Sequence, residues 1–119
     1  PQLPITTYLA SRYGYDAALA EAASRRVVEI VGAFSRRFAA QRAAGRRYLV
    51  GDSLTALDVW WAAFAAMLEP LPPELCAMRA DTRAAYAVRD PAVRAAIDPA
   101  LMEHRDFVYH THLELPVVL

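Results

Sequence analysis

Ten unbroken apolar residues, 59–68, constrain the fold of this chain more than any other stretch of it. Apolar side chains stand at every position of the run and not along one stripe, so a helix over it has to be enclosed by the rest of the fold. Pro70 and the two prolines that soon follow end the helix, because proline lacks a backbone donor and clashes with the preceding turn. The sequence therefore predicts a central buried helix over residues 56–69.

The start of this helix is marked by Thr55 and Asp58. A threonine at the N-cap accepts a hydrogen bond from the backbone N–H three residues on, and an acid at that third position reaches back to the N–H of the cap. Leu54 and Val59 have the spacing of a hydrophobic staple across the same helix start. We interpret Thr55 and Asp58 as a structural capping box, because an unpaired buried N–H costs about 1 to 3 kcal/mol.

The stretch from Gly51-Asp52 to Thr55-Ala56-Leu57-Asp58, followed by the apolar run, resembles the start of the central helix in the C-terminal domain of glutathione S-transferases. That domain is an all-α helical bundle, so the resemblance implies the same fold here, with a long amphipathic helix and a central buried helix. The resemblance covers residues 16–112. We assign residues 16–119 to one domain of this type and residues 1–15 to a linker or partial helix.

The resemblance also implies a function. In that family, glutathione and the residue that activates its thiol belong to an N-terminal thioredoxin-like domain, which residues 1–119 do not contain. We therefore expect this chain to be the substrate-site domain of a parent enzyme that adds the glutathione thiolate to an electrophile, and to be inactive by itself. The alternative is a non-catalytic protein–protein interaction module of the same fold.

The expected partners follow from the same resemblance. They are the thioredoxin-like domain, a second copy of the chain in a homodimer, and a small hydrophobic electrophile. No cofactor is expected in the chain, since glutathione is a co-substrate of the family. The alanine-rich, lysine-free composition indicates a bacterial source, and the lack of a signal peptide favours the cytoplasm.

Four aromatic residues are candidates for an acceptor-substrate pocket: Tyr8, Tyr13, Tyr15 and Trp61. The tyrosines precede the long helix, in a region that often forms one wall of the hydrophobic site in the family. The other interpretation is that they pack on an amphipathic surface. Trp60 and Trp61 are neighbours on one helix, so their side chains point about 100° apart and cannot both face one cavity. At least one of the two is expected in the core, and the other is left to line the pocket.

A long amphipathic helix is predicted over residues 17–44. Apolar side chains recur there every three or four residues, and four arginines lie off that stripe. Gly45 suits a left-handed C-cap, because it has no β-carbon. Between Arg12 and Arg47 there are eight arginines and three acidic residues. The whole chain has 13 basic and 13 acidic residues, so we expect no nucleic-acid partner.

Three shorter helices are predicted by their start signals. An aspartate at the N-cap accepts a hydrogen bond from the first turn, and a proline at the first helical position loses no intrahelical bond. The predicted helices are residues 83–88 after Asp81, residues 92–97 after Asp90-Pro91, and residues 100–113 after Asp98-Pro99.

No residue pattern in the sequence predicts a catalytic or metal site. His104, His110 and His112 are spaced by six and two, whereas metal ligands on one helix face need spacings of three or four. Cys76 has no neighbouring base that would activate its thiol. The longest apolar run is about half of the ~20 residues that a membrane span needs, so no membrane contact is expected.

Overall fold

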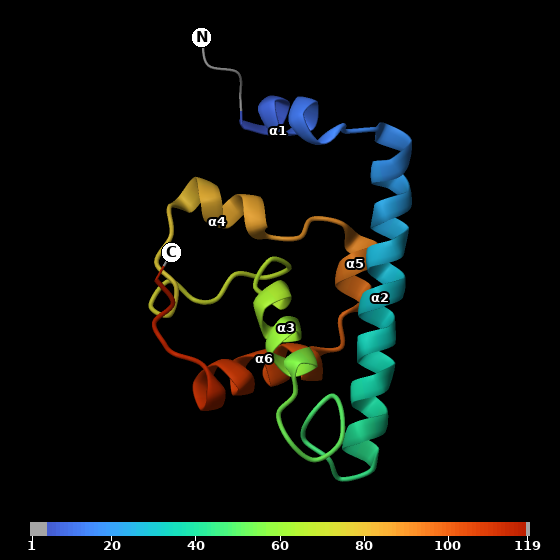
Figure 1. The fold of residues 1–119 in the computed structure, drawn as a ribbon, viewed down its shortest axis with the longest axis vertical. Coiled ribbons are helices and arrows are strands. Elements are labelled where there is room, and N and C mark those ends of the chain that lie inside the picture. Colours follow the sequence, from blue (N-terminus) through green and yellow to red (C-terminus); the bar gives the residue numbers. More distant parts are fainter. Residues whose placement is uncertain (1–4, 119) are drawn as a thin grey trace.

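The structure of the chain is a computed structural model that describes residues 5–118 (Figure 1). These residues contain six α-helices. They are α1 (Ile5–Tyr13), α2 (Ala17–Ala43), α3 (Ala56–Ala65), α4 (Ala80–Tyr86), α5 (Pro91–Ala96) and α6 (Pro99–His112). These residues form no β-structure beyond a single bridge, so the predicted all-α fold is confirmed. Residues 1–4 and 119, which belong to the predicted segments 1–15 and 16–119, lie outside the described residues. Within residues 5–118, no helix is both long and apolar enough to cross a membrane.

α2 is the predicted long helix. It begins at Asp16, whose carboxylate accepts a hydrogen bond from the N–H of Leu19 at 2.9 Å. Gly45 follows its end with a φ of 74°, a left-handed conformation that glycine adopts without strain. The N–H of Arg46 donates to the carbonyl of Gln41 at 2.9 Å across this turn, so one open carbonyl of the helix end is satisfied. The predicted helix and its glycine C-cap are confirmed.

The core lies where α3 and α6 meet the inner side of α2 (Figure 1). α3 packs against α6, and α2 packs against α5 and α6. Ser35 on α2 donates its hydroxyl to the carbonyl of Ala96 at 2.8 Å, which fixes α5 against the long helix. Two groups of buried side chains fill the core: Phe38, Leu49, Trp61, Ala65, Ala100 and Leu101 in one, and Ala62, Leu71, Cys76, Val108 and Tyr109 in the other.

α3 is covered on one side only. Its inward side chains are buried, among them Asp58 and Trp61, whereas Trp60 and Phe64 are 63% and 65% exposed. The prediction that this helix is enclosed on every side is wrong, because α6 packs against the inward side and no helix among residues 5–118 covers the outer side. The helix also ends at Ala65, earlier than predicted, and turns lead from there to Pro70.

The start signals of the last two helices are confirmed. Asp90 caps α5, and its carboxylate accepts a hydrogen bond from the N–H of Ala92 at 2.8 Å. Asp98 caps α6 and accepts from the N–H of Ala100 at 2.9 Å. In both helices proline occupies the first turn, where its missing N–H costs no hydrogen bond.

The prediction that a helix begins after a cap at Asp81 is wrong for α4. The N-cap is Arg79, and Asp81 lies inside the first turn. The Asp81 carboxylate accepts from the N–H of Thr82 at 2.8 Å and from Nη2 of Arg79 at 3.0 Å. An acid in the first turn is stabilised by the helix dipole as it would be at the cap, so aspartate alone does not fix the first residue.

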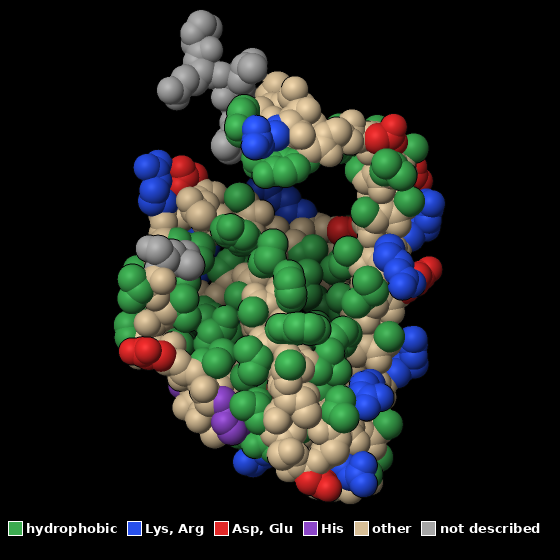
Figure 2. All heavy atoms as spheres, in the orientation of Figure 1, with side chains coloured by type: hydrophobic (Ala, Val, Ile, Leu, Met, Phe, Trp, Pro, Cys, Tyr) green, Lys and Arg blue, Asp and Glu red, His purple; other side chains and the backbone are tan. Residues whose placement is uncertain are grey.

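α1 projects from the rest of the molecule. Gly14, with a φ of 66°, turns the chain between α1 and α2. α1 packs against no other helix of the described residues, and Figure 2 shows open space between it and the body. Its apolar side chains therefore remain uncovered, including Leu9 at 42% exposed.

Candidate functional site

Asp58, at the start of α3, is fully buried, and both oxygens of its carboxylate are bonded. Oδ2 accepts hydrogen bonds from the backbone N–H and the hydroxyl of Thr55, both at 2.9 Å. Oδ1 accepts from the N–H of Leu49 at 2.8 Å and lies 2.8 Å from Nε2 of His104. Asp58 thus fixes the loop before α3 and joins it to α6.

Hydrogen bonds keep Asp58 ionised. Burial by itself raises the pKa of this carboxyl, but the N–H groups of Leu49 and Thr55 and the His104 imidazole together hold the pKa of Asp58 below its ordinary 3.8. An ionised carboxylate only accepts, so we assign the proton of the pair to Nε2 of His104, which donates it to Oδ1. The Asp58 side chain is 0% exposed, so it contacts no substrate and stabilises the fold.

An apolar surface lies on the outer side of α3. Trp60 and Phe64 lie there, and Met67 follows in the turn after α3; they are 63%, 65% and 53% exposed, and we call these three residues the α3 face. Figure 2 shows hydrophobic side chains gathered near the middle of the view, over α3, with basic side chains along the edge formed by α2. Adjoining exposed apolar side chains of this kind mark a surface that binds a ligand or another protein.

An apolar cavity of about 230 Å³ lies beside the α3 face and shares Met67 with it. The C-terminal tail reaches this cavity because the N–H of Val117 donates to the carbonyl of Leu75 at 2.7 Å. The lining has few polar groups, which suits a small apolar molecule. It consists of Ala63, Ala66, Met67, Leu71, Cys76, Met78, Tyr86, Tyr109 and Val117.

Tyr109, a residue of this lining, is 8% exposed. Burial raises the pKa of Tyr109 above its ordinary 10.0, and the nearby charge of Arg105 opposes the effect. The hydroxyl therefore stays protonated at neutral pH and keeps its ability to donate a hydrogen bond.

The sequence of this chain matches the model of a known protein family. The family described as "Glutathione S-transferase, C-terminal domain" matches residues 2–91. The chain belongs to this family. Searches of curated proteins and of solved structures gave no match. The family match includes α1 and α3 and stops before α6, whereas the sequence resemblance was placed at residues 16–112.

The structure brings two of the predicted substrate-binding residues of this glutathione S-transferase C-terminal domain together: Tyr13 and Tyr15 line one open hollow beside α1, whereas Tyr8 and Trp61 do not line it. Tyr8, Tyr13 and Tyr15 lie on or next to the projecting α1 and are 50%, 75% and 67% exposed. Trp61 is in the core at 5% exposed, where its indole N–H donates to the carbonyl of Leu101 at 2.9 Å. Substrate binding by these four aromatic residues stays a prediction.

Two features of the glutathione S-transferase C-terminal domain were missed from the sequence. The exposed member of the tryptophan pair is Trp60, and its spacing from Phe64 and Met67 is the helical signal that points to a shared face. His104 is the partner of Asp58 from 46 residues away, and no local pattern carries such a contact.

Proposed function

We propose that this chain is the substrate-site domain of a bacterial, cytoplasmic glutathione transferase. In the parent reaction the thiolate of glutathione forms a bond to the electrophilic carbon of a small hydrophobic compound, and the displaced electron pair goes into an opened π bond or leaves with a group such as chloride. A thioredoxin-like domain would supply glutathione and the residue that activates its thiol. This chain would supply the apolar half of the acceptor site and no reacting group.

The observation that carries the proposal is the apolar cavity beside the α3 face. Its volume of about 230 Å³ suits a compact acceptor, and its walls are almost entirely aliphatic and aromatic. The protonated hydroxyl of Tyr109 is a donor that orients a polar substituent of the acceptor.

The α3 face supports the same proposal from outside the cavity. Trp60 and Phe64 present flat apolar rings next to it, and such rings gain stability when a neighbouring domain covers them. Contacts between domains of one protein bury about 600 to 1,500 Å². A domain docked on this face would also close the cavity from solvent.

Two titrations of the chain test this proposal. Calorimetry with reduced glutathione should give no tight binding, because the glutathione site is assigned to the other domain. Tryptophan emission, corrected for ligand absorption, should show saturable quenching by 1-chloro-2,4-dinitrobenzene, because Trp60 is exposed beside the cavity. In the control Trp60→Phe, the buried Trp61 should respond little. Micromolar binding of glutathione, or quenching that never saturates, would contradict the proposal.

A second function, a non-catalytic protein–protein interaction module, is favoured by α1. This helix packs against no other helix of the described part of the chain and presents Tyr8 and Tyr13 to solvent. Sedimentation velocity separates the two functions. Concentration-dependent association that Tyr13→Ser weakens, in a chain that shows no saturable binding of the electrophile, would favour the interaction module. A monomer that binds the electrophile would favour the transferase domain.

A further inference from the structure

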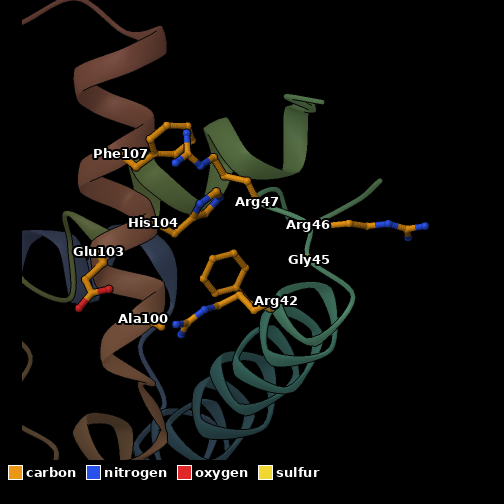
Figure 3. Close-up of a pocket in the computed structure, with 9 residues that line it drawn as sticks. Arg42, Gly45, Arg46, Arg47, Ala100, Glu103, His104 and Phe107 are labelled. Atoms are coloured by element: carbon orange, nitrogen blue, oxygen red, sulfur yellow. The ribbon is translucent and has the colours of Figure 1, made fainter. Parts of the chain in front are cut away.

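A second cavity, of about 500 Å³, lies at the C-terminal end of α2. Its volume is typical of sites for small molecules. It shares no residue with the α3 face or with the apolar cavity. Three aromatic rings and two arginines dominate its lining: Phe38, His104, Phe107, Arg42 and Arg47. Arg46 borders the cavity, but its side chain points away from it. Figure 3 shows Arg42, Arg47, His104 and Phe107 around the opening between the end of α2 and α6. We call this second cavity the arginine pocket.

Aromatic rings form a continuous wall of the arginine pocket. The ring centroids of Phe38 and His104 are 4.6 Å apart, and those of His104 and Phe107 are 5.9 Å apart. The His104 ring is held in place by its bond to Asp58. Phe38 and His104 are nearly buried, so the half-buried ring of Phe107 is the part of this wall that an apolar body can contact.

Arg42 and Arg47 extend from α2 and the following loop toward α6, whereas Arg46 points away from the pocket (Figure 3). The Arg47 guanidinium lies over the ring of Phe107, with Cζ 4.7 Å from the ring centroid. Such stacking orients a guanidinium. The N–H groups lie in the plane of the guanidinium itself and stay available to an acceptor.

The positive charges of Arg42 and Arg47 are not paired with an acidic side chain of the described residues. Within residues 5–118, no carboxylate lies within 4.0 Å of either guanidinium, and Glu103, the acid in the lining, pairs with neither. Arg46 differs, since its Nε lies 3.3 Å from Oδ1 of Asp52. The carbonyls at the end of α2 are partly satisfied by the turn through Gly45, which limits their repulsion of an anion.

We propose that the arginine pocket binds a small organic anion, in which a flat apolar body carries a carboxylate, phosphate or sulfonate group. Arg42 and Arg47 bind the oxyanion, because guanidinium groups match the geometry of such oxygens. Of the three rings, the half-buried Phe107 contacts the apolar body, since Phe38 and His104 are only 6% and 3% exposed. This site is separate from the proposed acceptor cavity, so the proposal of anion binding does not depend on the transferase proposal.

Nuclear magnetic resonance of the ¹⁵N-labelled chain tests the proposal with 2-naphthoate as the probe. Amides of Gly45, Ala100 and Phe107 should shift along one saturable curve. The neutral 2-naphthalenemethanol should bind about tenfold more weakly, because it offers no charge to the arginines. Phenyl phosphate and inorganic phosphate show whether a phosphate replaces the carboxylate and whether the apolar body is needed.

Two variants and a matched control complete the test. Arg42→Gln and Arg47→Gln should each weaken 2-naphthoate binding about tenfold. Arg46→Gln removes the same charge one residue from Arg47, on a side chain that points away from the pocket, and should change binding less than about twofold. All three arginines are exposed, so the variants should fold, which circular dichroism checks.

Three results would overturn the proposal. One is equal binding of 2-naphthoate to the wild type and to the Arg42→Gln/Arg47→Gln double variant. Another is equal binding of the neutral alcohol, which would make the pocket an apolar cavity only. The third is the absence of saturable shifts at millimolar probe, or shifts confined to the amides of the α3 face.

Discussion

Nε2 of His104 lies 2.8 Å from Oδ1 of Asp58, and the two side chains are 1% and 0% exposed. The residues are 46 positions apart, so this bond ties α6 to the first turn of α3. The ring of Phe38 packs against His104 with centroids 4.6 Å apart and helps to enclose the pair. In such a low-dielectric place, a polar group that loses its partner is costly. Asp58 therefore makes a tertiary contact with α6 and also binds the backbone N–H of the residue at the start of α3.

Asp58→Ala should destabilise the chain far more than Thr55→Ala. Removing the carboxylate leaves the N–H groups of Leu49 and Thr55 and the His104 imidazole without their acceptor, which costs about 3 to 5 kcal/mol. Thr55→Ala removes one hydroxyl contact and costs about 1 kcal/mol. Urea unfolding followed by circular dichroism measures both free energies.

Asp52→Ala is the matched control for this pair of variants. Asp52 is the other acid of the loop, but its side chain is 81% exposed and pairs only with Arg46 at the surface. The change should stay within about 0.5 kcal/mol. If Asp58→Ala does not fold, Asp58→Asn, which keeps one acceptor oxygen, takes its place. Equal unfolding midpoints for the Asp58 and Asp52 variants would refute the account of Asp58.

The stability of the chain should fall in acid partly because of Asp58. Its pKa is lower in the folded chain than the ordinary 3.8, so its contribution is complete well above pH 3.8 and is lost as the pH falls through the folded-state pKa. Urea midpoints measured from neutral pH down to about pH 3 should decrease. Asp58→Asn should flatten this decrease, whereas Asp81→Asn, at an exposed carboxylate, should flatten it less. A direct ¹³C titration of the Asp58 carboxyl that gives a pKa above 3.8 would contradict the prediction.

The two tryptophans should differ sharply in their access to solvent. Trp60 is 63% exposed, whereas Trp61 is 5% exposed and stacks on Phe34 with ring centroids 5.2 Å apart. Acrylamide should therefore quench Trp61→Phe strongly and Trp60→Phe weakly. The emission of Trp60→Phe should also lie at shorter wavelength, because only the buried indole remains. Similar quenching in both variants would show that the outer side of α3 is covered.

Two glycine substitutions should have opposite signs. Gly45→Ala should destabilise by about 1 kcal/mol, because the φ of 74° is unfavourable for alanine although open space surrounds the position. Gly32→Ala, inside α2, should stabilise by about 0.5 to 1 kcal/mol, since glycine is a poor helix former. Its new Cβ would meet only Nη1 of Arg36, at 3.3 Å, and that exposed side chain can move. Thermal unfolding of both variants checks the signs.

Local signals predicted the helices well, because they act within one turn of the chain. Asp90 and Asp98, each followed by proline, and Gly45 after the long helix lie where the sequence indicated. Asp81 misled because an acid is favourable both at the cap and within the first turn.

Long-range relationships of the candidate site were not predictable in this way. The apolar run predicted burial of α3, but composition does not reveal that no described helix covers Trp60 and Phe64. The bond from His104 to Asp58 depends on how α6 crosses α3, which no spacing within either helix records. Arg42 and Arg47 were seen as part of a basic stretch, and only the fold brings them to one cavity.

We propose that the apolar cavity beside the α3 face receives a small hydrophobic electrophile. The chain has three methionines, and Met67 and Met78 line this cavity whereas Met102 packs against the other core group. A ¹³C-methyl methionine spectrum recorded during titration with 1-chloro-2,4-dinitrobenzene therefore carries its own control. The methyl signals of Met67 and Met78 should move along one saturable curve while that of Met102 stays in place. No saturable movement, or an equal movement of Met102, would contradict the claim.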